Sequence, residues 1–297
     1  MKIYDCFMFS DEKILLDIRL NSLNKFVDKF IITEANYLHN GDPKKLNFNI
    51  NEFSKFKDKI EYIIVKDQPL NILSENKNDS LIKKDEKKIF NSILRDNYQR
   101  EQLRNGLKKL DDDDVIIISD LDEIPNLDNF DLKKINNEII FFKQKMFYYK
   151  LNLFYENFVW FGSKAIKKRN FISPQWLRNI KNKKYPFWRV DTLFSRKKYN
   201  NIKFVENGGW HFTCIKKPID IHKKLQTFAH HQDYERSNMS LFEIEKKIKE
   251  KKILYNHKAD KKNQNKWFSD EILQKIKLEH LPEFIIQNKN KYDEWID

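Results

Sequence analysis

Residues 115–118 read Val-Ile-Ile-Ile, four aliphatic side chains in a row between polar segments. Successive side chains of a β-strand point to opposite faces of its sheet. An unbroken aliphatic run therefore predicts a strand that is buried on both faces, as in parallel sheets covered by helices on each side.

The first third of the chain alternates between strand and helix patterns. Apolar runs at residues 3–9, 30–33 and 60–65 predict three strands. Ser10 is placed to cap a helix that begins near Asp11. Apolar residues at i, i+4, i+7 and i+11 give this helix one inward face: Leu16, Leu20, Leu23 and Val27. Alternation of this kind implies a parallel sheet layered by helices.

The rest of the chain changes character in two steps. A polar loop is expected at residues 71–85, and then a long helix from about 86 to 110. Its inward residues should be Ile89, Ile93, Leu103 and Leu107. The aromatic-rich, strand-like segments at 139–153 and 157–166 are expected to extend the sheet. They are also expected to form the floor of a substrate site, on the side where an acceptor molecule would bind. From about Pro218 the chain is charged and helical.

These patterns predict one α/β domain with a mostly parallel sheet at residues 1–217, and a helical C-terminal extension packed on it at 218–297. Hydrophobic residues make up 40% of the 297, which suffices for a sizeable core. No linker rich in Pro, Gly or Ser divides the chain. Cys6 and Cys214 lack the spacing of a metal finger or a disulfide framework, and both are expected to be buried and reduced.

Composition excludes some functions and leaves others open. The chain has 5 glycines, none spaced as a Rossmann fingerprint or a Walker loop requires. The net charge of +13 is compatible with a nucleic acid, an anionic membrane surface or a diphosphate. The basic residues are spread out and alternate with acids, which favours ordinary solvated surfaces. Without a signal peptide pattern or 18 consecutive apolar residues, the chain is expected to be soluble and cytoplasmic, with docking on a membrane left open.

The strongest chemical signal is Ser-Asp-Leu-Asp-Glu-Ile-Pro at residues 119–125, directly after the aliphatic strand. Asp120 and Asp122 are two apart, so an extended chain presents both carboxylates on one side, at the strand end where α/β sheets bind ligands. Their repulsion is relieved by a cation, and hard oxygens suit Mg²⁺ or Mn²⁺, which also bind substrate phosphates. The alternative is a plain acidic turn.

Three further clusters are ambiguous. Gly208 and Gly209 allow close backbone approach or positive φ beside Trp210 and His211, or they form a tight turn with a buried Trp. The second cluster is a pair of adjacent histidines, His230 and His231, beside an otherwise basic helix. On the long helix, two arginines share a face that could bind phosphate or simply face solvent: Arg100 and Arg104.

In this order, the residues resemble glycosyltransferase family 17, the β-1,4-mannosyl-glycoprotein β-1,4-N-acetylglucosaminyltransferase-like proteins. The similar segments span nearly the whole chain: residues 3–7, 17–20, 27–30, 33–35, 98–100, 116–125, 148–149, Trp160 with Gly162, Pro174 with 177–179, 208–212 and 228–230. The resemblance implies a GT-A fold, a UDP-GlcNAc donor, a divalent metal and an inverting transfer.

The chain departs from the family pattern on the expected acceptor side. The stretch between Arg178 and Asn207, which includes residues 188–196, is longer. Thr-Cys-Ile-Lys-Lys at 213–217 replaces a more usual Ser-Tyr-Leu-Gly-Gly, and Gln232 stands where a glutamate is expected. The acceptor therefore stays open.

The resemblance and the strand-end positions together assign expected roles. Asp122 is the expected ligand of Mn²⁺ or Mg²⁺, and Asp120 contacts the metal or the ribose. His211 is the first choice for a third metal ligand and His230 the second. Further donor-binding candidates are Glu34, Asp67, Arg95, Gln99 and Arg100. Acceptor-binding candidates are Trp160 and Trp210. The candidates for the catalytic base are Glu123, Asp191, Glu206 and Asp233.

The expected partners are a UDP-sugar, which the resemblance implies is UDP-GlcNAc, and a glycan acceptor, for which the resemblance suggests mannose; no nucleic acid is expected. Two alternatives remain at this point. One is a metal-dependent nucleic-acid enzyme that uses the same carboxylates and the positive charge. The other is a non-catalytic glycan-binding protein derived from a transferase.

Overall fold

The computed structural model describes residues 1–186, 188–192, 194–195, 197–228, 231–259, 266–267 and 269–297. Its centre is a sheet with the strand order β10-β6-β9-β4-β1-β2-β3. The strands are β1 (Ile3–Met8), β2 (Lys29–Ala35), β3 (Ile60–Val65), β4 (Val115–Ile118), β6 (Ile139–Phe142), β9 (Lys164–Lys167) and β10 (Ile202–Val205). The predicted aliphatic strand is β4, and all four of its residues are buried.

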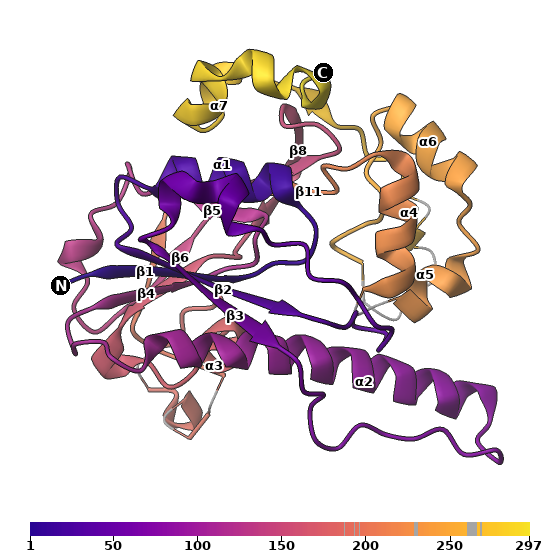
Figure 1. Cartoon of the computed structure of the whole chain (residues 1–297), viewed down its shortest axis with the longest axis horizontal. Helices are drawn as coiled ribbons and strands as arrows, with labels where there is room; N and C mark the ends of the chain where they lie inside the picture. The colour runs from indigo at the N-terminus through magenta and orange to yellow at the C-terminus, as the bar shows by residue number, and fades with distance from the viewer. Residues whose placement is uncertain (187, 193, 196, 229–230, 260–265, 268) are drawn as a thin grey trace.

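Helices cover both faces of this sheet (Figure 1). Helix α1 (Lys13–Leu23) lies over one face, and α2 (Leu81–Glu101) with α3 (Pro174–Asn179) lies over the other. The alternation along β1 matches this arrangement, because Phe7 packs in the core on the α1 side and Cys6 in the core on the α2 side. The predicted α/β class is confirmed.

The sheet is mixed rather than purely parallel. Strands β4, β1, β2 and β3 are parallel to one another, whereas β9 runs antiparallel to both β4 and β6. Strand β10 is parallel to β6. The carboxyl ends of β4, β1, β2 and β3 therefore meet at one edge, as the sequence predicted for the early strands.

The aromatic middle segments divide between two sheets. Strands β6 and β9 extend the main sheet as predicted, but β7 (Gln144–Tyr148) and β8 (Leu153–Trp160) do not. They belong to a second sheet of order β12-β8-β7-β11-β5, with β5 (Glu123–Pro125), β11 (Gly209–Thr213) and β12 (Gln274–Lys275). The reason is packing, because aromatic residues of β7 and β8 form a separate core with the C-terminal helices.

Two predicted helix boundaries are wrong. Ser10 does not cap α1, which begins at Lys13 after Glu12 and has no side-chain cap. Helix α2 begins at Leu81, inside the predicted loop, where Ser80 accepts a hydrogen bond from the Lys83 amide. It ends at Glu101 and continues as a 3₁₀ segment, η2 (Gln102–Leu107). Ile93 is 38% exposed rather than inward, because this part of α2 extends beyond the sheet (Figure 1).

The C-terminal third begins with a helix at Pro218, as predicted. Helices α4 (Pro218–Thr227), α5 (His231–Ser237) and α6 (Leu241–Lys249) lie together at one end of the molecule (Figure 1). Helix α7 (Glu283–Gln287) and the 3₁₀ segment η8 (Lys289–Trp295) return to α1, where Ile285 and Tyr292 join its core. The remaining 3₁₀ segments are η1 (Ile50–Phe56), η3 (Leu132–Lys134), η4 (Lys168–Asn170), η5 (Val190–Thr192) and η7 (Leu278–His280). The division at residue 217 stays a prediction.

Both cysteines are free and buried, as expected. Within the described residues, we find no helix that combines the length and the apolar character needed to cross a membrane.

Candidate active site at the carboxyl edge of the parallel strands

A cavity of about 660 Å³ lies where β1, β2 and β4 end. Its wall combines the segments that follow these strands, at residues 8–12, 37–39 and 120–122, with α4 residues of 220–227. This volume is within the range of small-molecule sites, which is roughly 300–1,000 Å³. The fold therefore places a ligand-sized hollow at the edge where the acidic turn was predicted to act.

One arginine holds two of the three acids in this turn. The guanidinium of Arg178, on α3, bonds both oxygens of Glu123 at 2.7 and 2.8 Å, and it bonds Asp120 Oδ2 at 2.7 Å. The side chain of Glu123 is completely buried. A buried carboxylate requires such a partner, because an unpaired buried charge is strongly destabilising. Lys164 fixes the end of α3 by donating to the carbonyls of Leu177 and Ile180.

A second arginine engages the other oxygen of Asp120. Arg100, near the end of α2, bonds Asp120 Oδ1 at 3.1 Å and Asp96 Oδ2 at 2.9 Å. Burial alone would raise the pKa of Asp120, but the guanidinium groups of Arg178 and Arg100 outweigh it and hold the pKa well below its usual value. Asp120 is therefore a fixed anion in this arrangement.

The turn is closed from the second sheet by a tryptophan and a glycine. Trp160 Nε1 donates to Glu123 Oε1 at 2.6 Å. A β-carbon at Gly162, in the connection between β8 and β9, would lie only 2.1 Å from Glu123 Cδ, so only glycine allows this segment to approach so closely. The ring of Trp160 also stacks on His211, with ring centroids 4.5 Å apart.

Asp122 has different surroundings from its two acidic neighbours. Asp122 lines the cavity, as Asp120 does, but its carboxylate faces an imidazole instead of the arginines, with His211 Nε2 3.6 Å from Asp122 Oδ2. Pairing of β11 with β5 brings His211 there, in a register that places it opposite Glu123. Gly209 permits this pairing, since it has φ +131° and a β-carbon would lie 2.1 Å from the Ile124 carbonyl oxygen.

Comparison with known proteins decides the family of this chain. The sequence model of glycosyltransferase family 17 matches residues 1–295. The chain belongs to this family. It is also similar to the β-1,4-mannosyl-glycoprotein 4-β-N-acetylglucosaminyltransferases of Homo sapiens, 31% identical over 118 residues, and of Rattus norvegicus, 29% identical over 131. The matches cover 38% and 43% of this chain, but only 20% and 22% of those relatives.

The donor set for a divalent cation is limited in this family 17 chain. Both oxygens of Asp120 accept hydrogen bonds from arginines, which leaves Asp122 and His211 as the ligands that the turn can offer. Within the described residues no group of three His, Cys, Asp or Glu side chains is arranged to hold a metal ion. His230 lies outside the described residues. A divalent cation held by Asp122 and His211 would therefore have to take most of its shell from substrate phosphates and water, as Mg²⁺ commonly does.

Cationic side chains that the sequence analysis missed line the same cavity. They are Lys44, Lys223 and Lys224. Lys224 Nζ lies 3.0 Å from Glu12 Oε1, and Lys216 is also near this carboxylate. Burial opposes ionisation of Glu12, but these two lysines hold its pKa well below the usual value. The Lys-Lys pair on a predicted helix was a visible signal, yet nothing in its local spacing connects it to the strand ends.

The other donor-binding candidates are near the cavity in different ways. Gln99 lines it and donates to the Thr33 carbonyl at 3.1 Å. Glu34 is buried and accepts from Lys44 and from the amides of residues 47 and 48, so it holds the loop beside the cavity. Arg95 donates to the His39 carbonyl at 3.1 Å from outside the lining, and Asp67 lies outside it too.

Three candidates lie away from the acidic turn, and a fourth, Trp210, pairs with Ile124 of the turn but lines a different hollow. Asp191 is exposed and paired with Arg189 and Lys198, Glu206 is paired with Lys143, and Asp233 is paired with Lys266. Trp210 donates from Nε1 to the His280 carbonyl at 2.7 Å and lines a separate hollow. None of these four lines the 660 Å³ cavity, whereas Asp11, Asp96 and Asp220 do. The structure thus unites the side chains of Asp120, Asp122, Glu123, Arg100, Trp160 and His211, whereas the side chains of these four have other partners.

Proposed function

We propose that this chain transfers N-acetylglucosamine from UDP-GlcNAc to a glycan hydroxyl, with inversion at the anomeric carbon and with a divalent cation. The observation that carries the proposal is the position of Asp122. Asp120 and Asp122 both line a donor-sized cavity, but Asp120, like Glu123, is held by arginines. Asp122 is therefore the acid of the turn whose carboxylate Arg100 and Arg178 do not engage.

The cavity has chemistry suited to each part of a nucleotide sugar. Phe9 and Tyr37 offer apolar surface for a base, and Gln99 and Asn47 offer hydrogen-bonding groups for a base or a ribose. Lysines 44, 223 and 224 add positive charge for a diphosphate, which needs no glycine loop here.

The reaction is a direct displacement. The acceptor oxygen forms a bond to the anomeric carbon while the bond to the diphosphate breaks, and the hydroxyl proton passes to a carboxylate. Bound Mn²⁺ or Mg²⁺ would supply Lewis-acid stabilisation of the leaving diphosphate, with Asp122 and His211 as its protein ligands. Of the carboxylates that line the cavity, Asp11 and Asp220 are about half exposed, so we propose them as base candidates in place of the buried Glu123.

The choice of sugar and acceptor comes from the relatives. Their names specify transfer of N-acetylglucosamine to a mannosyl glycoprotein. This chain spans about a fifth of their length, so the same donor sugar and a mannose-containing acceptor are proposals for it. The family assignment favours this reading over a nucleic-acid enzyme.

Substitution of Asp122 tests the proposal. Asp122→Ala should lower transfer from UDP-GlcNAc in the presence of Mn²⁺ by at least about 100-fold, since one preorganised charge at the reacting centre is worth that much. Its melting temperature without ligand should stay near that of the unmodified chain, because Asp122 is not held by the arginines. Stabilisation by UDP-GlcNAc with Mn²⁺, measured by thermal shift, should shrink as well.

The matched control is Asp128→Ala, an exposed acid just beyond the turn whose partner is Lys25. It should keep both activity and donor stabilisation. Full turnover and metal dependence in Asp122→Ala would contradict the assignment. Donor stabilisation without transfer to any tested glycan would instead support the non-catalytic alternative.

A further inference from the structure

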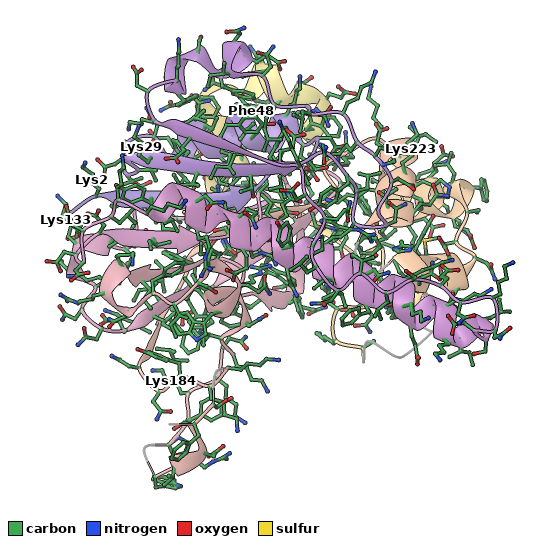
Figure 2. All side chains as sticks on the ribbon, turned by 60° about the horizontal axis from the view of Figure 1, so that its bottom comes forward. Lys2, Lys29, Phe48, Lys133, Lys184 and Lys223 are labelled. Carbon is green, nitrogen blue, oxygen red and sulfur yellow. The ribbon has the colours of Figure 1, made fainter. Side chains whose placement is uncertain are left out.

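The described residues of 181–201, which are 181–186, 188–192, 194–195 and 197–201, form a projection, and we call the segment 181–201 the basic arm. It leaves the body directly after α3, which carries Arg178, and returns to the edge strand β10. Figure 2 shows it extending away from the rest of the molecule, with Lys184 on it.

The charge of the arm is one-sided. Its sequence holds seven lysines and arginines against a single acid, Asp191. That acid is already bonded by Arg189 at 2.6 and 2.8 Å and contacted by Lys198. The arm therefore presents a net positive surface, unlike the alternating charges along most of the chain.

The arm also exposes bulky apolar side chains among these charges. Trp188 is 67% exposed, Val190 62% and Phe194 85%. Exposed apolar side chains this large are unfavourable in water, and three of them within seven residues of one projecting segment indicate an interaction site. A nucleic acid or an acidic glycan would satisfy the charges and leave the aliphatic Val190 without a role.

We propose that the basic arm docks this chain on an anionic lipid bilayer. Trp and Phe insert readily at the boundary between headgroups and acyl chains, and Lys and Arg are attracted to the negative surface around them. Because the arm starts where α3 ends, docking places the bilayer near the element that orders the acidic turn. The proposal is independent of the donor and of the transfer reaction.

The experiment is co-sedimentation of the full chain with vesicles of phosphatidylcholine, with or without phosphatidylglycerol. Binding should require phosphatidylglycerol and fall as salt is raised. A variant with Trp188→Ser, Val190→Ser and Phe194→Ser should bind at least about tenfold more weakly. A second variant, with Lys183→Glu, Lys184→Glu and Lys198→Glu, should lose binding to a similar extent.

The matched control replaces Leu81 and Ile82 by Ser. These residues are also exposed, at 80% and 68%, but they lie in a segment where acids balance the lysines. This control should bind like the unmodified chain, and circular dichroism should show that every variant is folded. No binding to anionic vesicles would overturn the proposal. So would binding that survives loss of the apolar side chains, or an equal effect of the control, because each outcome would assign the arm to a polyanion or to no specific partner.

Discussion

The acidic turn at residues 119–125 and the basic arm both concentrate charge, but the charges are paired and largely buried in the turn and mostly exposed in the arm. In the turn, Glu123 is fully buried and Asp120 accepts from two arginines, so neither carboxylate can move without breaking several bonds. In the arm, one acid is paired, and most of the described cations and the bulky apolar side chains are exposed. The comparison separates charges that fix the geometry of a site from charges that are exposed and can bind a partner.

This difference has an energetic basis. Inside the protein, a carboxylate must be satisfied completely, and the bonds that satisfy it also fix its geometry. At the surface, an ion pair contributes little stability, since water and salt screen it. Substitutions in the turn should therefore change stability strongly, and substitutions in the arm should leave it almost unchanged.

The largest effect is expected from Arg178→Met, which removes the shared partner of Asp120 and Glu123. The variant should lose about 3–5 kcal/mol of unfolding free energy, the usual result of leaving one member of a buried ion pair alone. Urea denaturation followed by circular dichroism measures this loss.

A double-variant cycle shows whether the loss comes from the stranded charge. Glu123→Gln keeps the shape of the side chain and removes its charge, so Arg178→Met should cost less in that background than in the unmodified chain. Equal costs in the two backgrounds would mean that the charge of Glu123 does not account for the loss, since Arg178 also bonds Asp120 and the Gly162 carbonyl.

The sequence predicted part of this site because part of it is local. The aliphatic run at 115–118 identified β4, and the spacing of Asp120 and Asp122 identified the turn at its end. Arg178 was missed as the partner, since it lies 58 residues away from Asp120 and reaches it only after α3 packs against the sheet. Glu123 was taken as a base for the same reason, because its burial depends on distant residues, Trp160 and Gly162.

The fold, like the site, was predictable where the sequence signal is local and not where distant residues decide the structure. Strands with clear apolar runs were predicted, and so was the α4 start at Pro218, because these signals need no distant partner. The second sheet was not predicted, since β7 and β8 share the aromatic composition of β6 and only their packing on the C-terminal helices sets them apart. The lysines of α4 reached the cavity through the same long-range packing, which the local sequence does not encode.

A smaller effect on stability is expected when the pH is lowered. The pKa of Asp120 is lowered in the folded chain, so its contribution to stability is complete above the ordinary value of about 4 and is lost as the pH falls below it. Asp120→Asn removes this titration. Between pH 4 and pH 3, the melting temperature of the variant should fall by roughly 2 °C less than that of the unmodified chain. A parallel fall in both proteins would mean that the arginines do not lower this pKa.

The smallest change in stability should come from the arm. The variant with Trp188→Ser, Val190→Ser and Phe194→Ser should stay within about 0.5 kcal/mol of the unmodified chain in urea denaturation, since exposed side chains contribute little to the core. Its transfer activity on a water-soluble acceptor should also be unchanged. A large loss of stability would show that these side chains pack within the arm, and the contrast with the acidic turn would fail. Unchanged stability together with weaker vesicle binding would place the function of the arm outside the fold, in contact with a partner.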